Sequence, residues 1–221
     1  MLLINQNLFI MKKLFLVFGL MIGSLVTFAQ LPTFGIRGGV NFANLLISAE
    51  GSNLSVSTGS LTTYSFGIFA DFRSGNTSFQ PAINYTGKGG SITGDGGTSG
   101  KFNLHYLQVP LNVVFHAPAL VGDLYFGAGP YIAMGLSGTA TGSDGTTTES
   151  DKVTFGGTNG DFESTDIGID GIAGLKLKSG FLVHVNYDFG LTNILNSSNP
   201  NNTGGGQIKT RTFGISVGYA F

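Results

Sequence analysis

Residues 212–221 read TFGISVGYAF and alternate at every step between a small or polar residue and a large apolar one. Alternation with a period of two is typical of a β-strand, because successive side chains point to opposite faces. One face carries Phe213, Ile215, Val217, Tyr219 and Phe221. The opposite face carries Thr212, Gly214, Ser216, Gly218 and Ala220. The segment therefore predicts a strand with one bulky apolar face and one narrow face.

The same contrast recurs in seven segments upstream, which brings the predicted number of strands to eight. These segments are residues 34–46, 61–73, 77–87, 101–116, 123–137, 165–178 and 181–194. Short connections at about 74–76, 117–122 and 179–180 alternate with long ones. The long connections, rich in Gly, Ser, Thr and Asn, are about 47–60, 88–100, 138–164 and 195–208. This layout is typical of outer-membrane barrels, whose short turns and both termini lie in the periplasm.

Composition indicates which strand face meets lipid. The 221 residues include 36 Gly and 19 Phe, and only 10% are charged. An eight-stranded barrel has a narrow interior that small side chains fit, so the bulky face points outward. A soluble sandwich or lipocalin-like barrel would instead bury the bulky face. No run of 18 apolar residues follows Ala29, so no spanning helix is predicted. We predict an all-β protein, an eight-stranded antiparallel transmembrane β-barrel, over residues 30–221.

The aromatic residues of the outward face form two predicted belts at the two membrane interfaces, as in other outer-membrane barrels. Near the short turns lie Phe34, Phe72, Phe79, Phe115, Phe126, Phe181 and Phe221. Nearer the long loops lie Phe42, Tyr64, Tyr85, Tyr187 and Phe213. The alternative is that these aromatic residues serve only as good strand formers.

Charged and polar residues with inward parity predict a polar network in the lumen. Its members are Arg37, Asp71, Arg73, Gln80, Asn84, Gln108, Asp170, Lys176, His184 and Asp188. Buried charges must pair, and this set contains both signs, so we expect a plugged lumen rather than an open pore. Arg211 has outward parity but lies at the loop end of the last strand, where its long side chain can reach the interface.

The first 29 residues read as a cleaved secretory signal peptide. Met11-Lys12-Lys13 is a basic start, residues 14–25 are apolar, and Thr27-Phe28-Ala29 supplies small residues before a cleavage site. We expect translation to start at Met11, because residues 1–10 carry no positive charge. A retained signal-anchor is the alternative. The chain has no Cys, which excludes a lipoprotein anchor, disulfides and thiolate zinc sites.

Three segments carry a resemblance to a known family: FGIRGGVNF (34–42), YLQVPL (106–111) and GYAF (218–221). With the signal at 11–30, they resemble the small outer-membrane β-barrel domain proteins of Bacteroidota, labelled porin family or PorT-like. The resemblance covers the whole mature chain and implies location and fold rather than an activity. It also implies that the barrel-assembly machinery recognises the aromatic last strand. The chain departs from the family at Gln108, where an acidic residue is common.

Enzymatic motifs are missing from the sequence. The three histidines are scattered, no G-x-S-x-G elbow is present, and Thr86-Gly87-Lys88 is not a P-loop. His184 and Asp188 share inward parity and can form an acid–base pair, but a structural network is the competing interpretation. We therefore expect no enzyme activity, no cofactor and no metal. The formal net charge of −1 gives no reason to expect a nucleic-acid partner.

The third long connection concentrates acidic residues around a single Lys152. They are Asp144, Glu149, Asp151, Asp161, Glu163 and Asp166. Such oxygen ligands can recruit divalent cations that bridge lipopolysaccharide phosphates, although a solvated loop of like charges is the alternative.

The four long loops favour a structural or surface-interaction role at the cell envelope. The alternatives are a narrow passive porin and an accessory component of a secretion apparatus. Expected partners are outer-membrane lipid, lipopolysaccharide, the barrel-assembly machinery and an unidentified envelope protein, and we expect a monomer.

Overall fold

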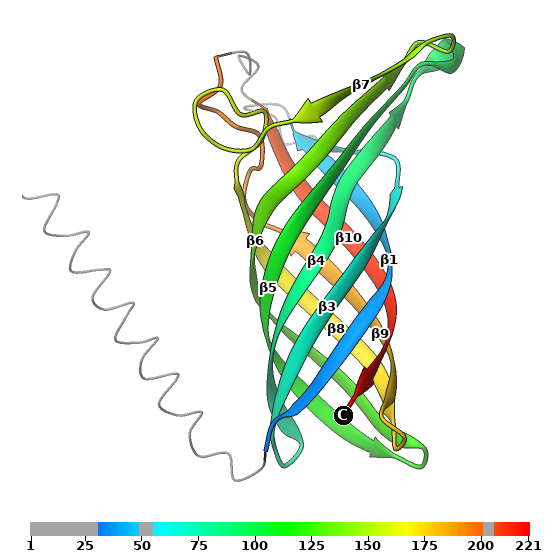
Figure 1. Ribbon diagram of the computed structural model, residues 1–221, viewed down its shortest axis with the longest axis vertical. Helices are drawn as coiled ribbons and strands as arrows, with labels where there is room; N and C mark the ends of the chain where they lie inside the picture. Colours follow the sequence, from blue (N-terminus) through cyan, green and yellow to red (C-terminus); the bar gives the residue numbers. More distant parts are fainter. Residues whose placement is uncertain (1–30, 49–54, 201–205) are drawn as a thin grey trace, which may run out of the picture.

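The computed structural model describes residues 31–48, 55–200 and 206–221, and eight of its strands form a closed antiparallel barrel (Figure 1). These strands are β1 (Thr33–Ser48), β3 (Leu61–Ser74), β4 (Thr77–Thr93), β5 (Ser99–Ala119), β6 (Gly122–Ser143), β8 (Thr165–Leu177), β9 (Phe181–Gly190) and β10 (Gln207–Ala220). Consecutive strands pair around the ring, and β1 pairs with β10 from Gly35↔Ala220 to Ser48↔Gln207. The predicted eight-stranded barrel is thereby confirmed.

Three smaller elements accompany the barrel. The short strand β2 (Ser55–Ser57) pairs with the end of β1, and β7 (Thr148–Val153) pairs with the end of β6. A 3₁₀ turn, η1 (Asp95–Gly97), connects β4 to β5. No helix among the described residues is long and apolar enough to span a membrane.

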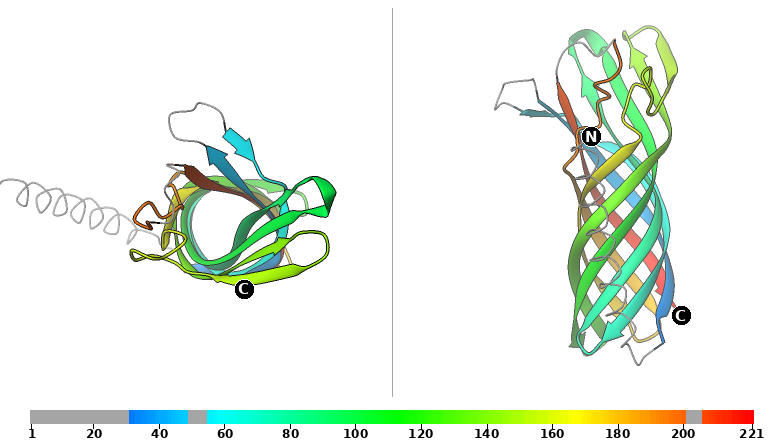
Figure 2. Two further views of the ribbon diagram at one scale, coloured as in Figure 1. Left: turned by 90° about the horizontal axis from the view of Figure 1, so that it is seen from above. Right: turned by 90° about the vertical axis from the view of Figure 1, so that its left-hand side faces the viewer.

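The two ends of the barrel differ, and we call them the turn end and the loop end. At the turn end β3 and β4, β5 and β6, and β8 and β9 are joined by tight turns, and the chain terminus lies beside the start of β1 (Figure 1). Gly75 (φ 61°) and Gly180 (φ 93°) occupy left-handed backbone positions in two of these turns, as tight hairpins require. At the loop end several strands extend past the ring as long hairpins (Figure 2).

The long connections contain more strand than the sequence predicts. The predicted loop at 88–100 is mostly a hairpin, since β4 continues to Thr93 and β5 begins at Ser99. The predicted loop at 138–164 contains the end of β6 and all of β7. Conversely, β9 ends at Gly190, four residues before the predicted boundary, so the following loop begins earlier. Polar, Gly-rich strands lack the apolar alternation on which the prediction depends.

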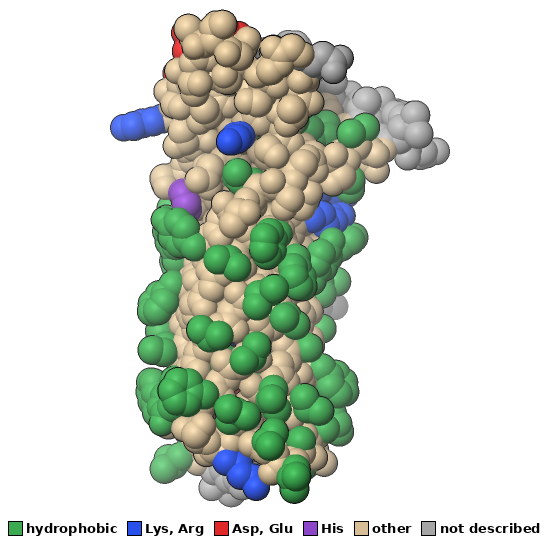
Figure 3. All heavy atoms as spheres, turned by 90° about the vertical axis from the view of Figure 1, so that its right-hand side faces the viewer, with side chains coloured by type: hydrophobic (Ala, Val, Ile, Leu, Met, Phe, Trp, Pro, Cys, Tyr) green, Lys and Arg blue, Asp and Glu red, His purple; other side chains and the backbone are tan. Residues whose placement is uncertain are grey.

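The strand faces follow the predicted parity. Ile36, Ile68 and Ile83 are paired neighbours on β1, β3 and β4, and all three are exposed on the outside. Figure 3 shows hydrophobic side chains over the lower part of one face, with a histidine and basic side chains at their upper limit. Inside, glycines make room for rings, since a Cβ on Gly174 would collide with Tyr125 and one on Gly168 with Tyr131. The predicted signal peptide (1–29) and the start at Met11 lie outside the described residues.

Candidate functional site

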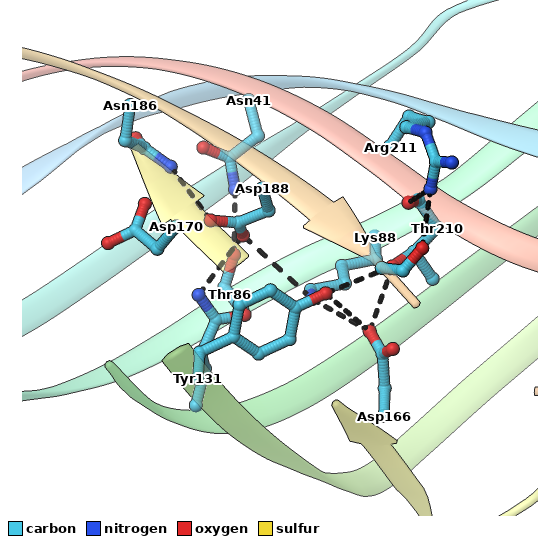
Figure 4. A network of polar contacts seen from close by, with 12 residues as sticks. Asn41, Thr86, Lys88, Tyr131, Asp166, Asp170, Asn186, Asp188, Thr210 and Arg211 are labelled. Atoms are coloured by element: carbon cyan, nitrogen blue, oxygen red, sulfur yellow. Dashed lines mark hydrogen bonds and ion pairs between the residues drawn. The ribbon is translucent and has the colours of Figure 1, made fainter. Parts of the chain in front are cut away.

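The interior of the barrel nearest the loop end is organised around a buried lysine. Lys88 Nζ on β4 lies 2.9 Å from Asp166 Oδ2 on β8 and 3.8 Å from Asp188 Oδ2 on β9. Tyr131 on β6 and Thr210 on β10 also donate hydrogen bonds to Asp166 Oδ2. These side chains come from β4, β6, β8, β9 and β10, and Figure 4 shows how they converge. The cluster thus ties opposite walls of the barrel together.

A second group of contacts lies directly below, around the register pair Asp170↔Asp188. Gln108 donates to Asp188 Oδ2 at 3.1 Å, and Asn112 donates to Asp170 Oδ2 at 2.7 Å. All four side chains are buried. Asn186 adds a longer bond of 3.4 Å to the other oxygen of Asp188. Amide side chains from β5 and β9 therefore bond to both oxygens of Asp188 and to one oxygen of Asp170, while Asp170 Oδ1 is buried without a partner among the described residues.

The third group contains Arg37 and His184. Arg37 Nη1 lies 3.2 Å from His184 Nε2, and Tyr125 Oη lies 3.0 Å from His184 Nδ1. A guanidinium group has only donors, so Nε2 must accept. The ring proton therefore lies on Nδ1, which donates to Tyr125, and the imidazole is neutral. His184 and Asp188, which the sequence allows as an acid–base pair, bond to other partners here, as the competing interpretation of a structural network expects.

Near the turn end the interior becomes more open. His116 Nε2 lies 2.8 Å from Ser78 Oγ and 3.8 Å from Asp71 Oδ2, all within buried side chains. Arg73 pairs with Asp123 at 2.8 Å, but about a quarter of each side chain is exposed. Arg73 therefore bridges strands at the rim rather than joining the buried network. Lys176 is also partly exposed and lines a mouth of about 550 Å³.

Most of the predicted lumen residues thus face the interior. Gln80 and Asn84, the two not yet described, also face it. Gln80 is buried, and Asn84 accepts a 3.4 Å bond from Arg37. The prediction missed several network members: Asn41, Thr86, Lys88, Asn112, His116, Tyr125, Tyr131, Asp166 and Thr210. Parity could have found most of them, because Lys88 continues the inward series of Gln80 and Asp166 precedes Asp170 by four residues.

An apolar cluster covers the network at the loop end. Its buried members from loops are Phe162 and Ile194, and they pack with Leu45, Leu104, Tyr106, Tyr131, Ala133 and Val153. Phe155 packs against this cluster, with its ring 5.6 Å from that of Tyr106 in an edge-on arrangement. We call these residues the loop-end cap. Phe155 and Phe162, which the sequence places in the external connection 138–164, therefore form part of a core, and so does Ile194 from the end of the predicted strand 181–194.

Cavities within the lumen are small. One of about 20 Å³ is lined by Arg37, Asn41, Gln108 and Asp170, among others. Another of about 10 Å³ lies toward the turn end beside Asp71 and Arg37. A water molecule needs roughly 10–15 Å³ of such space, so each cavity is of the size of a single water. Neither accommodates a sugar or an amino acid.

The predicted interface aromatics lie on the outer surface. Phe42 stacks on Phe213 and Tyr64 on Tyr85 toward the loop end, with ring centroids 6.4 and 6.0 Å apart. Toward the turn end the pairs are Phe72–Phe79 and Phe115–Phe126. The remaining members, Phe34, Phe181, Phe221 and Tyr187, are exposed. Tyr219, which the prediction omitted, joins the turn-end group through contacts with Phe181 and Phe221.

The candidate cation site in the acidic loop is not formed. Among the described residues no group of three or more His, Asp or Glu side chains is arranged to hold a metal ion. Asp144 accepts bonds from the backbone and hydroxyl groups of Thr146 and Thr147, and Asp161 accepts from Thr154. Glu149 and Asp151 are exposed on β7, and Glu163 lies in the following loop. Only Asp166 points into the barrel.

A closed eight-stranded barrel with an apolar exterior and a polar interior is the architecture of a bacterial outer-membrane protein. A family model described as outer membrane protein beta-barrel domain matches residues 28–196. The chain belongs to this family, and membership implies an outer-membrane location. No curated protein matches the chain.

Several solved structures are similar to the chain. Ail, the attachment invasion locus protein of Yersinia pestis, is 15% identical with a TM-score of 0.43, covering 87% of this chain and 100% of that chain. Neisserial surface protein A is 15% identical with a TM-score of 0.43, covering 86% and 98%. The N-terminal β-barrel domain of Pseudomonas aeruginosa OprF is 12% identical with a TM-score of 0.35, covering 85% and 97%.

Proposed function

We propose that this protein is an integral outer-membrane barrel with a closed lumen, which serves the envelope structurally and through surface contacts rather than by passing solutes. One observation carries the proposal: the polar network and the loop-end cap fill successive levels of the interior. Inside the open mouth of about 550 Å³ at the turn end, the two lumen cavities described above measure only about 10–20 Å³ each. A solute path would require breaking buried ion pairs, which is costly without replacement partners.

We propose further that the loop end faces outside and that the turn end, with both termini, faces the periplasm. Tight turns at one end and long hairpins at the other support this orientation, since outer-membrane barrels place short turns in the periplasm.

The surface contacts would be made by the projecting hairpins. β6 has 22 residues and β9 has 10. At about 3.4 Å per residue, β6 is therefore longer than β9 by roughly 40 Å. Among the described residues, β7 has β6 as its strand partner on one side, and its residues 148–152 are exposed. An edge strand with Glu149, Asp151 and Lys152 is protected by charge against indiscriminate pairing, which favours a partner of complementary charge.

Two other functions remain predictions from the sequence: a narrow passive porin and an accessory component of a secretion apparatus. The small lumen cavities count against the first. The second, like membership of the PorT-like group of Bacteroidota, rests on the sequence resemblance. We also propose that the protein has no enzymatic activity, because the buried titratable groups bond mainly to one another. A monomer remains an expectation from the sequence.

Liposome swelling tests the closed lumen against the narrow porin. Proteoliposomes are diluted into isosmotic arabinose or glycine, with a general porin as positive control. Swelling at the rate of empty liposomes supports the proposal. Swelling that is faster for glycine than for arabinose would instead establish a narrow pore.

A further inference from the structure

Two cations lie side by side on the outer surface of β10, just beyond the lipid-facing aromatics. Lys209 and Arg211 share the parity of the exposed Phe213 and Ile215, and both are partly exposed. Their cross-strand partners are uncharged, namely Leu46 and Asn44 on β1 and Phe189 on β9. In Figure 4 the Arg211 side chain points away from the lumen cluster around Lys88. The pair therefore belongs to the outer surface and not to the network.

The guanidinium of Arg211 is held in place. Its Cζ lies 3.6 Å from the centroid of the Phe189 ring, and Nη1 donates to the carbonyl oxygens of Gly190 and Thr210, each at 2.7 Å. Within the described part of the chain, Nε and Nη2 have no acceptor, and neither does Lys209 Nζ. A stacked guanidinium with a free edge is suited to bidentate bonding of phosphate oxygens.

The height of the pair on the barrel matches lipid headgroups. Phe213 belongs to the predicted aromatic belt at the loop end. Arg211 and Lys209 come two and four residues before Phe213 in β10, and so lie farther toward the loop end. With about 3.4 Å per residue and a strand tilt of about 40°, they lie roughly 5 and 10 Å beyond the belt. The polar headgroup layer of a bilayer occupies roughly this zone outside the hydrocarbon.

We propose that Lys209 and Arg211 form a binding site for a phosphate monoester on a glycolipid of the outer leaflet, such as the lipid A part of lipopolysaccharide. A phosphate monoester carries about −1.5 to −2 charges at neutral pH, so it matches two cations that have no carboxylate in register with them. A phospholipid phosphodiester carries a single charge and satisfies the pair less well. This inference rests on the proposed orientation, in which the loop end is outside.

Native mass spectrometry of the refolded protein in detergent, titrated with diphosphorylated lipid A, tests the site. We compare the wild type with Lys209→Gln/Arg211→Gln, and with Lys101→Gln/Lys178→Gln as the matched control. The control removes two exposed cations from the projecting hairpin and from a tight turn. Phosphatidylglycerol and inorganic phosphate serve as the other probes. Heat-modifiable gel migration verifies folding, and Lys209→Gln alone replaces the double variant if that variant does not fold.

Loss of two charge-assisted contacts should weaken lipid A binding by about tenfold or more in the site variant and by less than about twofold in the control. We expect phosphatidylglycerol to bind all variants equally, and phosphate not to compete at millimolar concentration. Equal weakening in both variants, no weakening in either, or the same losses with phosphatidylglycerol would overturn the site. Orientation is measured separately, by labelling a Cys introduced at Gly142 on intact cells, so its failure is distinguishable from failure of the site.

Discussion

The ammonium group of Lys88 and the carboxylate of Asp166 form an ion pair with no solvent exposure, 2.9 Å apart across the interior of the barrel. The Lys88 ammonium also lies 4.1 Å from the centre of the Tyr131 ring, and the Tyr131 hydroxyl donates a hydrogen bond to Asp166. Desolvated charges are tolerated only when their partners are in place. The interior is therefore sensitive to a change of charge at this pair.

Replacing Lys88 with Met should destabilise the barrel strongly, because Asp166 and Asp188 lose their shared cation. Removing one partner of a buried pair costs about 3–5 kcal/mol of unfolding free energy. Urea unfolding in lipid vesicles, followed by tyrosine fluorescence, measures this loss. Lys152→Met on the exposed part of β7 is the control, expected to change stability by less than about 0.5 kcal/mol.

The double variant Lys88→Met/Asp166→Asn should recover a large part of that loss. The second substitution removes the Asp166 carboxylate that Lys88→Met leaves without a cation. The loss of unfolding free energy in the double variant should therefore be smaller than the sum of the two single losses by about 1 kcal/mol or more. Losses that simply add would mean that the two side chains do not interact in the folded protein.

A charge on the lipid face should be costly in proportion to its depth. Ile68 lies midway between the predicted belts on β3, flanked by Ile36 and Ile83. Ile68→Arg should cost about 2–4 kcal/mol in vesicles. Val56→Arg on β2, which is exposed outside the barrel ring, should be nearly neutral. Equal effects at the two positions would argue against lipid around β3.

Glycines on the inward face should not tolerate a methyl group where a neighbouring strand is close. A Cβ on Gly129 would collide with the Leu111 carbonyl, whereas one on Gly142 of the same strand meets no atom within 4 Å. Gly129→Ala should therefore lose about 1–3 kcal/mol, and Gly142→Ala should lose nothing or gain slightly. Urea midpoints of the two variants provide the comparison, and a neutral Gly129→Ala would contradict the packing described.

The turn between β6 and β7 should resist acid through one carboxylate. Hydrogen bonds from Thr147 and Thr146 hold the pKa of Asp144 below its usual range. Because the pKa of Asp144 is lower in the folded protein than in the unfolded chain, its carboxylate stabilises the turn at any pH above the unfolded-state pKa. This stabilisation is lost only as the pH falls through the folded-state pKa. The Thr146 and Thr147 amides should thus remain protected from exchange at pH 3. Asp144→Ala should remove that protection, and protection that survives this change would disprove the link.

The barrel could be predicted from the sequence because the apolar alternation on strands such as β10 is strict, and because turn length alternates. The hairpins that extend beyond the ring could not be predicted in this way. Lys88-Gly89-Gly90-Ser91 reads as a turn, yet β4 continues through it because Gly89 (φ 147°) adopts a backbone conformation that brings it against the Phe102 carbonyl. Ending the strand at residue 87 removed Lys88 from the predicted lumen.

The residues of the interior could be predicted only in part. Inward parity identified Arg37, Asp170 and Asp188, but Asp166 was counted among the acidic loop residues although it shares the parity of Asp170. The loop-end cap had no sequence signal. Phe155 and Phe162 lie in irregular chain without periodicity, and they are brought together by isolated pairing with each other and with Leu195. Such long-range contacts are a property of the folded chain.

Planar-bilayer conductance tests the closed lumen most directly. Purified, heat-modifiable protein is inserted from dilute detergent at 1 M KCl and neutral pH, and hundreds of insertions are recorded at both voltage polarities. We predict no stable conductance steps above the baseline of protein-free detergent. A reproducible unitary conductance that changes in Arg37→Ala or Asp71→Ala would contradict the account and establish passage through the lumen.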